Sequence, residues 1–195
     1  MALKLIIFDM DGTLVEKFTL NLLPGVRPFF DLLLRDGCEA LPRIAVATNQ
    51  GGVGLRYWLQ QRGERFSQYP TEDEVERRLY ELAQRLGAGL HLLTYAAYRY
   101  QTKEGFWVPA PPGAGDLPRW QADWRKPGPG MLLQAMQDAG AGRHETLFVG
   151  DSTEDQLAAQ AAGCAFVWAA NFFSQRWTCA SLQALPAGLQ TGEPG

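Results

Sequence analysis

The sequence predicts a doubly wound α/β domain with a mostly parallel sheet and no large cap domain. Short apolar runs alternate with stretches of helical periodicity, a pattern typical of β-α units. Polar clusters follow three of these runs, as expected where parallel strands end in loops. The 195 residues suffice for one well-buried core. We therefore expect a single domain over residues 1–185 and a flexible, Pro- and Gly-rich tail over 186–195.

The first half of the chain contains three expected strands and two expected helices. The strands are the apolar runs at 3–8, 44–47 and 91–95. Apolar residues at i, i+3, i+4 and i+7 from Val26 predict an amphipathic helix that ends at Gly37. The second helix begins at Thr71, because Thr71 and Glu74 have the spacing of a capping box.

The second half begins with the least regular stretch of the chain. Residues 97–125 are rich in Pro, Gly and Trp, which predicts a long loop or small lid. Strands and helices alternate again after this stretch. The expected elements are a helix over 132–139, a strand over 146–149, a helix over 157–162 and a strand over 165–168.

Composition and charge argue against several classes of protein. The net charge of -3 gives no general attraction to nucleic acid or to anionic membranes. No apolar run approaches membrane-spanning length and the N-terminal segment leaves no room for a signal peptide, so we expect a cytoplasmic protein with no membrane partner. The three cysteines lie far apart, which argues against a disulfide framework and a thiolate zinc site. We expect a monomer or a weak oligomer.

Three polar clusters lie at the expected carboxyl ends of strands. They are Asp9-Met10-Asp11-Gly12-Thr13, Thr48-Asn49-Gln50 and Gly150-Asp151-Ser152-Thr153-Glu154-Asp155. The clusters can meet in one crevice, because the carboxyl ends of parallel strands share one edge of a sheet. Several aspartates in one crevice repel one another unless a cation neutralises them, and oxygen ligands favour Mg²⁺. The Thr48 hydroxyl and the Lys126 ammonium are candidate phosphate ligands.

These residues, in this order, resemble the haloacid dehalogenase-like (HAD) hydrolase superfamily over residues 3–168. The motif residues are Asp9, Asp11, Thr48, Lys126, Asp151 and Asp155. The resemblance implies that Asp9 is the nucleophile that becomes an aspartyl phosphate. Asp11 would protonate the leaving oxygen and later activate water. Mg²⁺ would be held by the Asp9 side chain, the Asp11 main-chain carbonyl and Asp151, with Asp155 in a supporting role.

The motif sequences resemble one branch of the superfamily more closely than the others. Asp11 fits phosphatases and phosphomutases, since the dehalogenases lack an acid at this position and the ion-pumping ATPases carry Thr. The segments TNQGGVG, RKPGPGML and LLPGV resemble the subfamily IIIA-like branch, whose nearly capless enzymes include histidinol-phosphate, heptose bisphosphate and polynucleotide 3'-phosphatases. Residues 14–42 accordingly hold one helix and leave no space for a helical cap.

The chain also departs from that branch. The Cys and His zinc loop of its sugar-phosphate and histidinol-phosphate members is replaced by Tyr95-Ala96-Ala97-Tyr98-Arg99-Tyr100 and Ala122-Asp123-Trp124, so we expect no structural zinc. Arg125 matches a substrate-recognition arginine of the heptose enzymes. Asn49 and Gln50 are weaker candidates for phosphate binding.

The predicted function is Mg²⁺-dependent hydrolysis of a phosphate monoester of a small metabolite, with a sugar phosphate as one candidate. A polynucleotide 3'-phosphatase is the alternative, favoured by the missing zinc loop and a basic and aromatic group but opposed by the acidic net charge. That group is Arg56, Tyr57, Trp58, Arg62 and Arg65. An amphipathic helix covering the sheet explains the group more simply. A non-catalytic phosphate-binding regulatory module is the third hypothesis.

Overall fold

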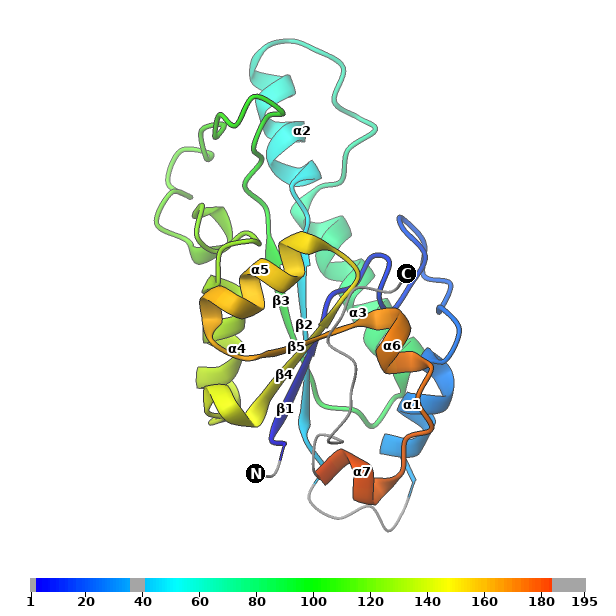
Figure 1. Ribbon diagram of the computed structural model, residues 1–195. Helices are drawn as coiled ribbons and strands as arrows, with labels where there is room; N and C mark the ends of the chain where they lie inside the picture. Colours follow the sequence, from blue (N-terminus) through cyan, green and yellow to red (C-terminus); the bar gives the residue numbers. More distant parts are fainter. Residues whose placement is uncertain (1–2, 36–40, 184–195) are drawn as a thin grey trace.

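The computed structural model describes residues 3–35 and 41–183, and its centre is a five-stranded parallel sheet (Figure 1). The strands are β1 (Leu5–Phe8), β2 (Arg43–Asn49), β3 (Leu92–Ala97), β4 (Thr146–Gly150) and β5 (Ala165–Trp168). Their order is β3-β2-β1-β4-β5, so the first strand lies in the middle. The predicted doubly wound parallel sheet is confirmed. The expected helix end at Gly37 and the expected tail at 186–195 lie outside the described residues.

Helices cover both faces of the sheet, and each face buries alternate side chains of β1. Ile6 and Phe8 pack with one group of helices, whereas Leu5 and Ile7 pack with the other. The first group is α1 (Val26–Leu33), α3 (Glu72–Leu86), α6 (Ala169–Phe173) and α7 (Cys179–Gln183). The second group is α4 (Gly130–Ala139) and α5 (Thr153–Ala162).

One helix does not cover the sheet. α2 (Gly52–Gln61) lies beyond the carboxyl ends of the strands, where it forms a lobe with residues 98–125 (Figure 1). The Gly54 N–H donates to the Tyr98 carbonyl at 3.0 Å and ties the two parts together. Only Val53 and Gly54 of α2 are buried, so the helix lacks the continuous apolar stripe that packing on a sheet requires. The expectation that this segment covers the sheet is wrong.

Several boundaries differ from the sequence-based expectation. β2 continues through Thr48 and Asn49, because these polar residues still pair with β3. The short helices α6 and α7 were not expected, and neither was the 3₁₀ turn η1 (Pro118–Trp120) within the irregular segment. Cys179 is disulfide-bonded, a bond that the expectation against a disulfide framework did not include. Among the described helices, none has the length and apolar character needed to cross a membrane.

Candidate active site

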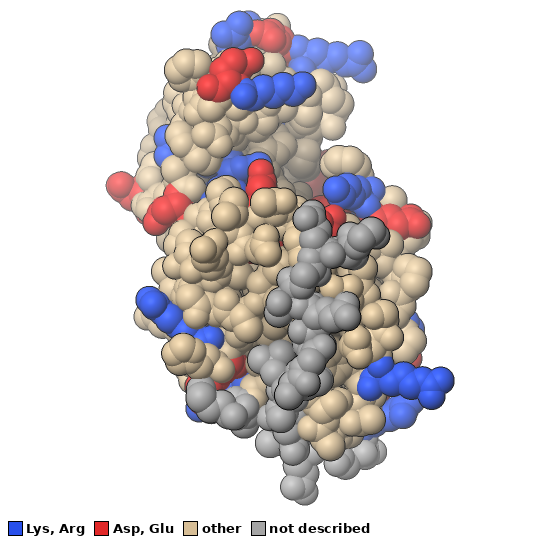
Figure 2. Space-filling model, in the orientation of Figure 1, with Lys and Arg blue, Asp and Glu red and all other residues tan. Residues whose placement is uncertain are grey.

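The three polar clusters meet at the carboxyl edge of the sheet. Asp9 follows the central strand β1, and its N–H donates to the Val149 carbonyl of β4 at 2.9 Å. Thr48 lies on β2 and Asp151 follows β4, so the strands on both sides of β1 bring their clusters to Asp9. Together they line a cavity of about 210 Å³. Figure 2 shows a hollow between the lobe and the body of the molecule, with acidic and basic side chains along its rim.

Lys126 is buried between two carboxylates. Its Nζ lies 2.5 Å from Asp9 Oδ1 and 2.6 Å from Asp155 Oδ1. All three side chains are almost completely buried, with residue exposures of 3% for Lys126, 6% for Asp9 and 1% for Asp155. Charge-assisted bonds of this kind are strong in a dry interior. The ammonium is therefore held against the carboxylate that the motif predicts as the nucleophile.

The carboxylates outnumber the cations around Lys126. One ligand oxygen each from Asp9, Asp151 and Asp155 lie within 4.8 Å of one another. Three carboxylates face the buried ammonium of Lys126 and the exposed ammonium of Lys17, which lies 3.7 Å from Asp151, so an excess of negative charge is left that a cation would balance. Burial, opposed by the attraction of Lys126, raises the pKa of Asp9 to about 7. Burial and the charge of Asp155 likewise raise the pKa of Asp151. The donor set and the charge fit a hard cation such as Mg²⁺.

Asp155 is held in place by the start of α5. Ser152 caps this helix, and Asp155 completes the capping box. Asp155 Oδ2 accepts from the Ser152 hydroxyl at 2.7 Å and from the N–H groups of Ser152 and Asp151 at 3.1 and 3.2 Å. Its other oxygen faces Lys126. Asp155 thus connects the fixed geometry of a helix terminus to the position of the lysine.

Glycine at position 12 lets the β1 loop approach Asp151. Gly12 has φ +89°, and a Cβ at this position would collide with the Asp151 carboxylate. An L side chain at Gly12 would therefore be strained and would also displace a candidate metal ligand.

Asp11 lies at the same edge but has a different environment. Its Oδ1 accepts from Arg78 Nη2 at 2.6 Å and from the Phe18 N–H at 3.0 Å. Its Oδ2 accepts from Arg78 Nη1 at 2.9 Å and from Gln50 Nε2 at 3.1 Å. Burial alone would raise the pKa of Asp11, but Arg78 and the two other donors outweigh it and lower that pKa. In the substrate-free protein Asp11 is therefore held as a carboxylate, and it must take up a proton before it can act as an acid.

The β2 residues organise the site through hydrogen bonds. The buried Thr48 Oγ1 accepts from Gln50 Nε2 at 2.9 Å, so Gln50 links Thr48 to Asp11. Asn49 contacts the main chain of Lys126: its Nδ2 donates to the Lys126 carbonyl at 2.9 Å and its Oδ1 accepts from the Lys126 N–H at 3.0 Å. The Asn49 amide thus orients the lysine. Direct phosphate contacts by Asn49 and Gln50 stay predictions.

Arg125 lies beside the start of α2 rather than among the carboxylates. A Cβ on Gly51 would be 2.8 Å from Arg125 Nη1. Burial lowers the pKa of Arg125, while the charge of Glu154 opposes this shift. Its role in substrate recognition stays a prediction.

Sequence reasoning missed two cations of the site. Lys17 Nζ lies 3.7 Å from Asp151 Oδ2, and its place six residues after Asp11 could have marked it as a candidate. Arg78 lies on α3, far from every motif, and only the tertiary structure brings it to Asp11.

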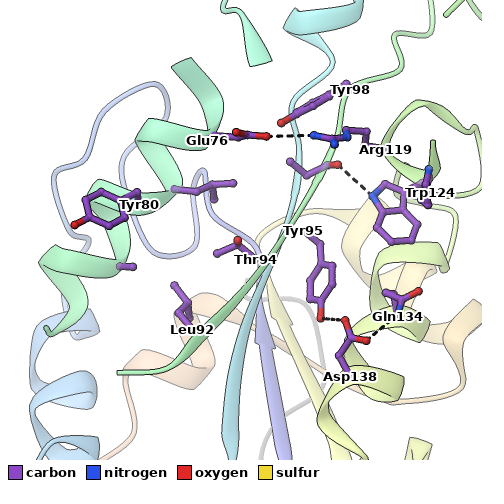
Figure 3. Close-up of a pocket in the computed structure, with 14 residues that line it drawn as sticks. Glu76, Tyr80, Leu92, Thr94, Tyr95, Tyr98, Arg119, Trp124, Gln134 and Asp138 are labelled. Carbon is purple, nitrogen blue, oxygen red and sulfur yellow. Dashed lines mark hydrogen bonds and ion pairs between the residues drawn. The ribbon is translucent and has the colours of Figure 1, made fainter. Parts of the chain in front are cut away.

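A larger cavity, of about 620 Å³, lies over the outer edge of β3 (Figure 3). Its polar groups pair with one another. Asp138 accepts from the Tyr95 hydroxyl at 2.7 Å and from Gln134 at 2.8 Å, and Arg119 lies 3.2 Å from Glu76. The smaller cavity, where carboxylates and a buried ammonium converge, is the better candidate for chemistry.

Comparisons with known proteins agree with this geometry. A HAD-hydrolase-like family model matches residues 123–178. The phosphoglycolate phosphatase of Pseudomonas syringae pv. syringae (strain B728a) is 30% identical, over 84% of this chain and 68% of the relative. The heptose-1,7-bisphosphate 7-phosphatase of Pseudomonas aeruginosa is 31% identical, over 62% of this chain and 53% of the relative.

The fold is shared with a solved structure. The D,D-heptose 1,7-bisphosphate phosphatase from B. bronchiseptica, complexed with magnesium and phosphate, superposes with a TM-score of 0.50 at 24% identity, over 85% of this chain and 80% of that one. One family accounts for the central parallel sheet, for the carboxylates at its edge and for these similarities. The chain belongs to the HAD-like hydrolases and is a phosphatase of that family.

Proposed function

We propose that this phosphatase hydrolyses phosphate monoesters of small metabolites with Mg²⁺, through an aspartyl phosphate on Asp9. The observation that carries the proposal is the 2.5 Å contact between Lys126 and Asp9, buried within a cluster in which carboxylates outnumber ammonium groups. A dianionic phosphate approaches such a cluster only when positive charge is supplied next to the nucleophile. Lys126 supplies part of it.

The proposed reaction has two steps. The Asp9 carboxylate attacks phosphorus and the bond to the ester oxygen breaks, while Asp11, which first takes up a proton from solvent, gives that proton to the leaving oxygen. Water then attacks the phosphorus of the aspartyl phosphate and gives a proton to Asp11, which restores both residues. Lys126 holds Asp9 in place throughout, and Thr48 lines the same cavity as a candidate phosphate donor.

Mg²⁺ fits the carboxylate cluster described above. The Asp9 carboxylate, the Asp11 main-chain carbonyl and Asp151 would hold the ion, since Asp155 is occupied by Lys126 and Ser152. The bound ion supplies the positive charge that offsets repulsion between the phosphate and the carboxylates.

Two observations support a small substrate. The relatives described above are named for phosphoglycolate and for a heptose bisphosphate, and the latter supports the IIIA-like branch. Basic and aromatic residues of α2 and of the segment that follows it pack on one another: the Arg62 guanidinium lies 5.1 Å over the Trp58 ring, and that of Arg56 lies 5.1 Å over the Phe66 ring. Internal pairing thus accounts for Arg56, Trp58 and Arg62 without a nucleic acid.

The test compares the wild type with Asp9→Asn on p-nitrophenyl phosphate with Mg²⁺. We expect the variant to lose at least about 10³-fold in kcat, because the amide is not a nucleophile. Asp116→Asn, at an exposed carboxylate, is the matched control. A panel of 2-phosphoglycolate, sugar phosphates and a 3'-phosphorylated oligonucleotide then identifies the substrate class. Wild-type protein that releases phosphate from none of these esters would favour the regulatory module instead.

A further inference from the structure

Two cations line the cavity at the carboxyl edge of the sheet, and they are held very differently. Lys126 is buried between Asp9 and Asp155, which occupy its ammonium. The Lys17 side chain is 65% exposed, and its Nζ lies at the longer distance of 3.7 Å from Asp151 Oδ2. Exposed ion pairs of this kind contribute little free energy. Of the two cations, Lys17 is therefore the one that can take a further anion.

The loop that carries Lys17 is closed by its own hydrogen bonds. The Glu16 N–H donates to the Asn21 carbonyl at 3.0 Å, and the Thr19 N–H donates to the Glu16 carbonyl at 3.0 Å. The Asn21 side chain also donates to Glu16 Oε2 at 3.0 Å. Residues 16–21 thus form a compact turn that includes Lys17.

Two further hydrogen bonds tie this turn to the site. The Phe18 N–H donates to Asp11 Oδ1 at 3.0 Å, and the Thr19 carbonyl accepts from Arg78 Nη2 at 2.7 Å. Phe18 has φ 65°, which is uncommon for a bulky residue, and because its ring is 92% exposed, packing of the ring does not maintain this backbone. Strained backbone persists only where its surroundings hold it, and it is often found at ligand-binding sites. The turn therefore presents Lys17 from a fixed position.

The side chain of Lys17 extends from the turn over Gly12. A Cβ on Gly12 would lie 3.2 Å from Lys17 Cε, and it would also collide with the Asp151 carboxylate. Glycine at position 12 therefore leaves room for the lysine stem and for Asp151 at the same wall of the cavity.

The contact between Lys17 and Asp151 weakens when Asp151 is a metal ligand. Under the proposed function, Asp151 holds Mg²⁺ together with Asp9 and the Asp11 main-chain carbonyl. A cation on Asp151 offsets the negative charge that attracts the ammonium. The exposed ammonium is then available to an anion that enters the cavity beside the phosphate group.

We propose that Lys17 binds a second anionic group of the substrate, so that the substrate is a phosphate monoester with another anion close to its ester bond. This inference deepens the proposed function and rests on it. Asp151 and the exposed Glu154 line the same cavity and repel an anion that no cation meets. Lys17 offsets this repulsion and so selects doubly anionic esters over singly anionic ones.

The test compares substrates with and without the second anion. 2-Phosphoglycolate is paired with its neutral amide, and propane-1,3-diol bisphosphate is paired with the monophosphate, all with Mg²⁺ at a concentration that saturates every variant. We expect Lys17→Met to lower the ratio of kcat/KM, charged over neutral member, about 5- to 20-fold in at least one pair, mainly through KM. The pair that responds shows whether the second anion is a carboxylate or a phosphate.

Three control variants accompany this comparison. Lys17→Arg keeps the charge and should keep most of the wild-type ratio, whereas a disturbance of the turn would lower the activity on both members alike. Lys103→Met, at an exposed lysine outside the cavity lining, should leave the ratio unchanged. If circular dichroism shows that Lys17→Met does not fold, Lys17→Gln removes the same charge and should lower the ratio equally.

A measurement without turnover separates binding from chemistry. 3-Phosphonopropionate and propane-1,3-bisphosphonate carry the second anion on a chain that cannot be hydrolysed, and propylphosphonate lacks this anion. Isothermal titration calorimetry in the presence of Mg²⁺ should show that Lys17→Met weakens binding of at least one of the first two by about 5- to 20-fold more than binding of propylphosphonate.

The possible outcomes are distinguishable. Equal losses for both members of every pair, or a wild-type ratio in Lys17→Met, would overturn the role of Lys17. A ratio that falls in Arg125→Gln but not in Lys17→Met would assign the second anion to Arg125 instead. A wild type that hydrolyses none of the esters would overturn the proposed function, and selective loss of phosphonate binding in Lys17→Met would still support the binding role of Lys17.

Discussion

Lys126 links the stability of the protein to the chemistry that we propose for the site. It is buried, it contacts two carboxylates, and its main chain is held by Asn49. A buried ion pair adds little to stability over an apolar pair, but loss of one partner leaves an uncompensated charge. Removal of Lys126 should therefore cost more stability than the loss of an exposed phosphate ligand would.

We predict that Lys126→Met lowers the free energy of unfolding by about 3–5 kcal/mol near pH 8 without Mg²⁺. Asp9 and Asp155 would then face each other without a cation. Part of the loss should return at lower pH, when one carboxyl takes up a proton. Urea unfolding measures both effects, with the exposed Lys103→Met as the control. Equal stability of the two variants would contradict the prediction.

The sequence predicted the site residues that lie next to strand ends. Asp9, Thr48 and Asp151 follow or end apolar runs, so the topology alone brings them together. It could not predict Arg78, because the position of an arginine on a helix surface says nothing about which loop the helix faces. The hydrogen bonds between Asn49 and the Lys126 main chain could not be predicted either, because Lys126 follows an irregular segment and not a strand.

At the scale of elements, α3 shows which features are local enough to predict. Its capping box, read from Thr71 and Glu74, is confirmed: Glu74 N–H donates to Thr71 Oγ1 at 3.2 Å and Thr71 N–H donates to Glu74 Oε2 at 2.8 Å. The placement of α2 was not predictable in the same way. From its mixed aromatic and basic residues, α2 was expected to be an amphipathic helix that covers the sheet, but it lies beyond the ends of the strands.

We predict that Thr71→Ala destabilises the protein by about 1 kcal/mol, because the first turn of α3 loses its cap. The kcat for an aryl phosphate should stay close to wild type, since Arg78 lies two turns further along the helix. Thr71→Ser, which keeps a hydroxyl cap, should restore the stability. Urea unfolding and steady-state kinetics test these expectations, and an equal loss in both variants would show that the cap is not the cause.

For the whole molecule, the site couples folding to protons and to metal. Burial raises the pKa of Asp9 from 3.8 to about 7 in the metal-free protein. Between about pH 4 and pH 7, Asp9 therefore keeps a proton in the folded protein that it has lost in the unfolded chain. The stability that this proton contributes is fully present below about pH 4 and is lost as the pH rises through about 7. A cation that requires ionised Asp9 should have the opposite pH dependence.

We predict that Mg²⁺ at about 100 times its Kd raises the free energy of unfolding by about 2.7 kcal/mol, and by less as the pH falls below about 7. In the absence of Mg²⁺, the wild type should lose more stability than Asp9→Asn between about pH 5 and pH 8. Urea unfolding of both proteins with and without Mg²⁺ measures this. The same pH profile in both proteins would show that Asp9 does not titrate in this range.

β1 is the earliest strand of the described chain, and it is also the middle strand of the sheet. During synthesis, Asp9 leaves the ribosome long before Lys126, Asp151 and Asp155 exist. Its neighbour β4 spans residues 146–150, so β1 has a strand on both sides only after most of the chain has been made. A prematurely terminated chain would carry the proposed nucleophile without the ammonium beside it or the proposed metal ligands of the later chain. If Asp9 acts as proposed, we therefore expect unfinished copies of this phosphatase to be inactive toward phosphate esters.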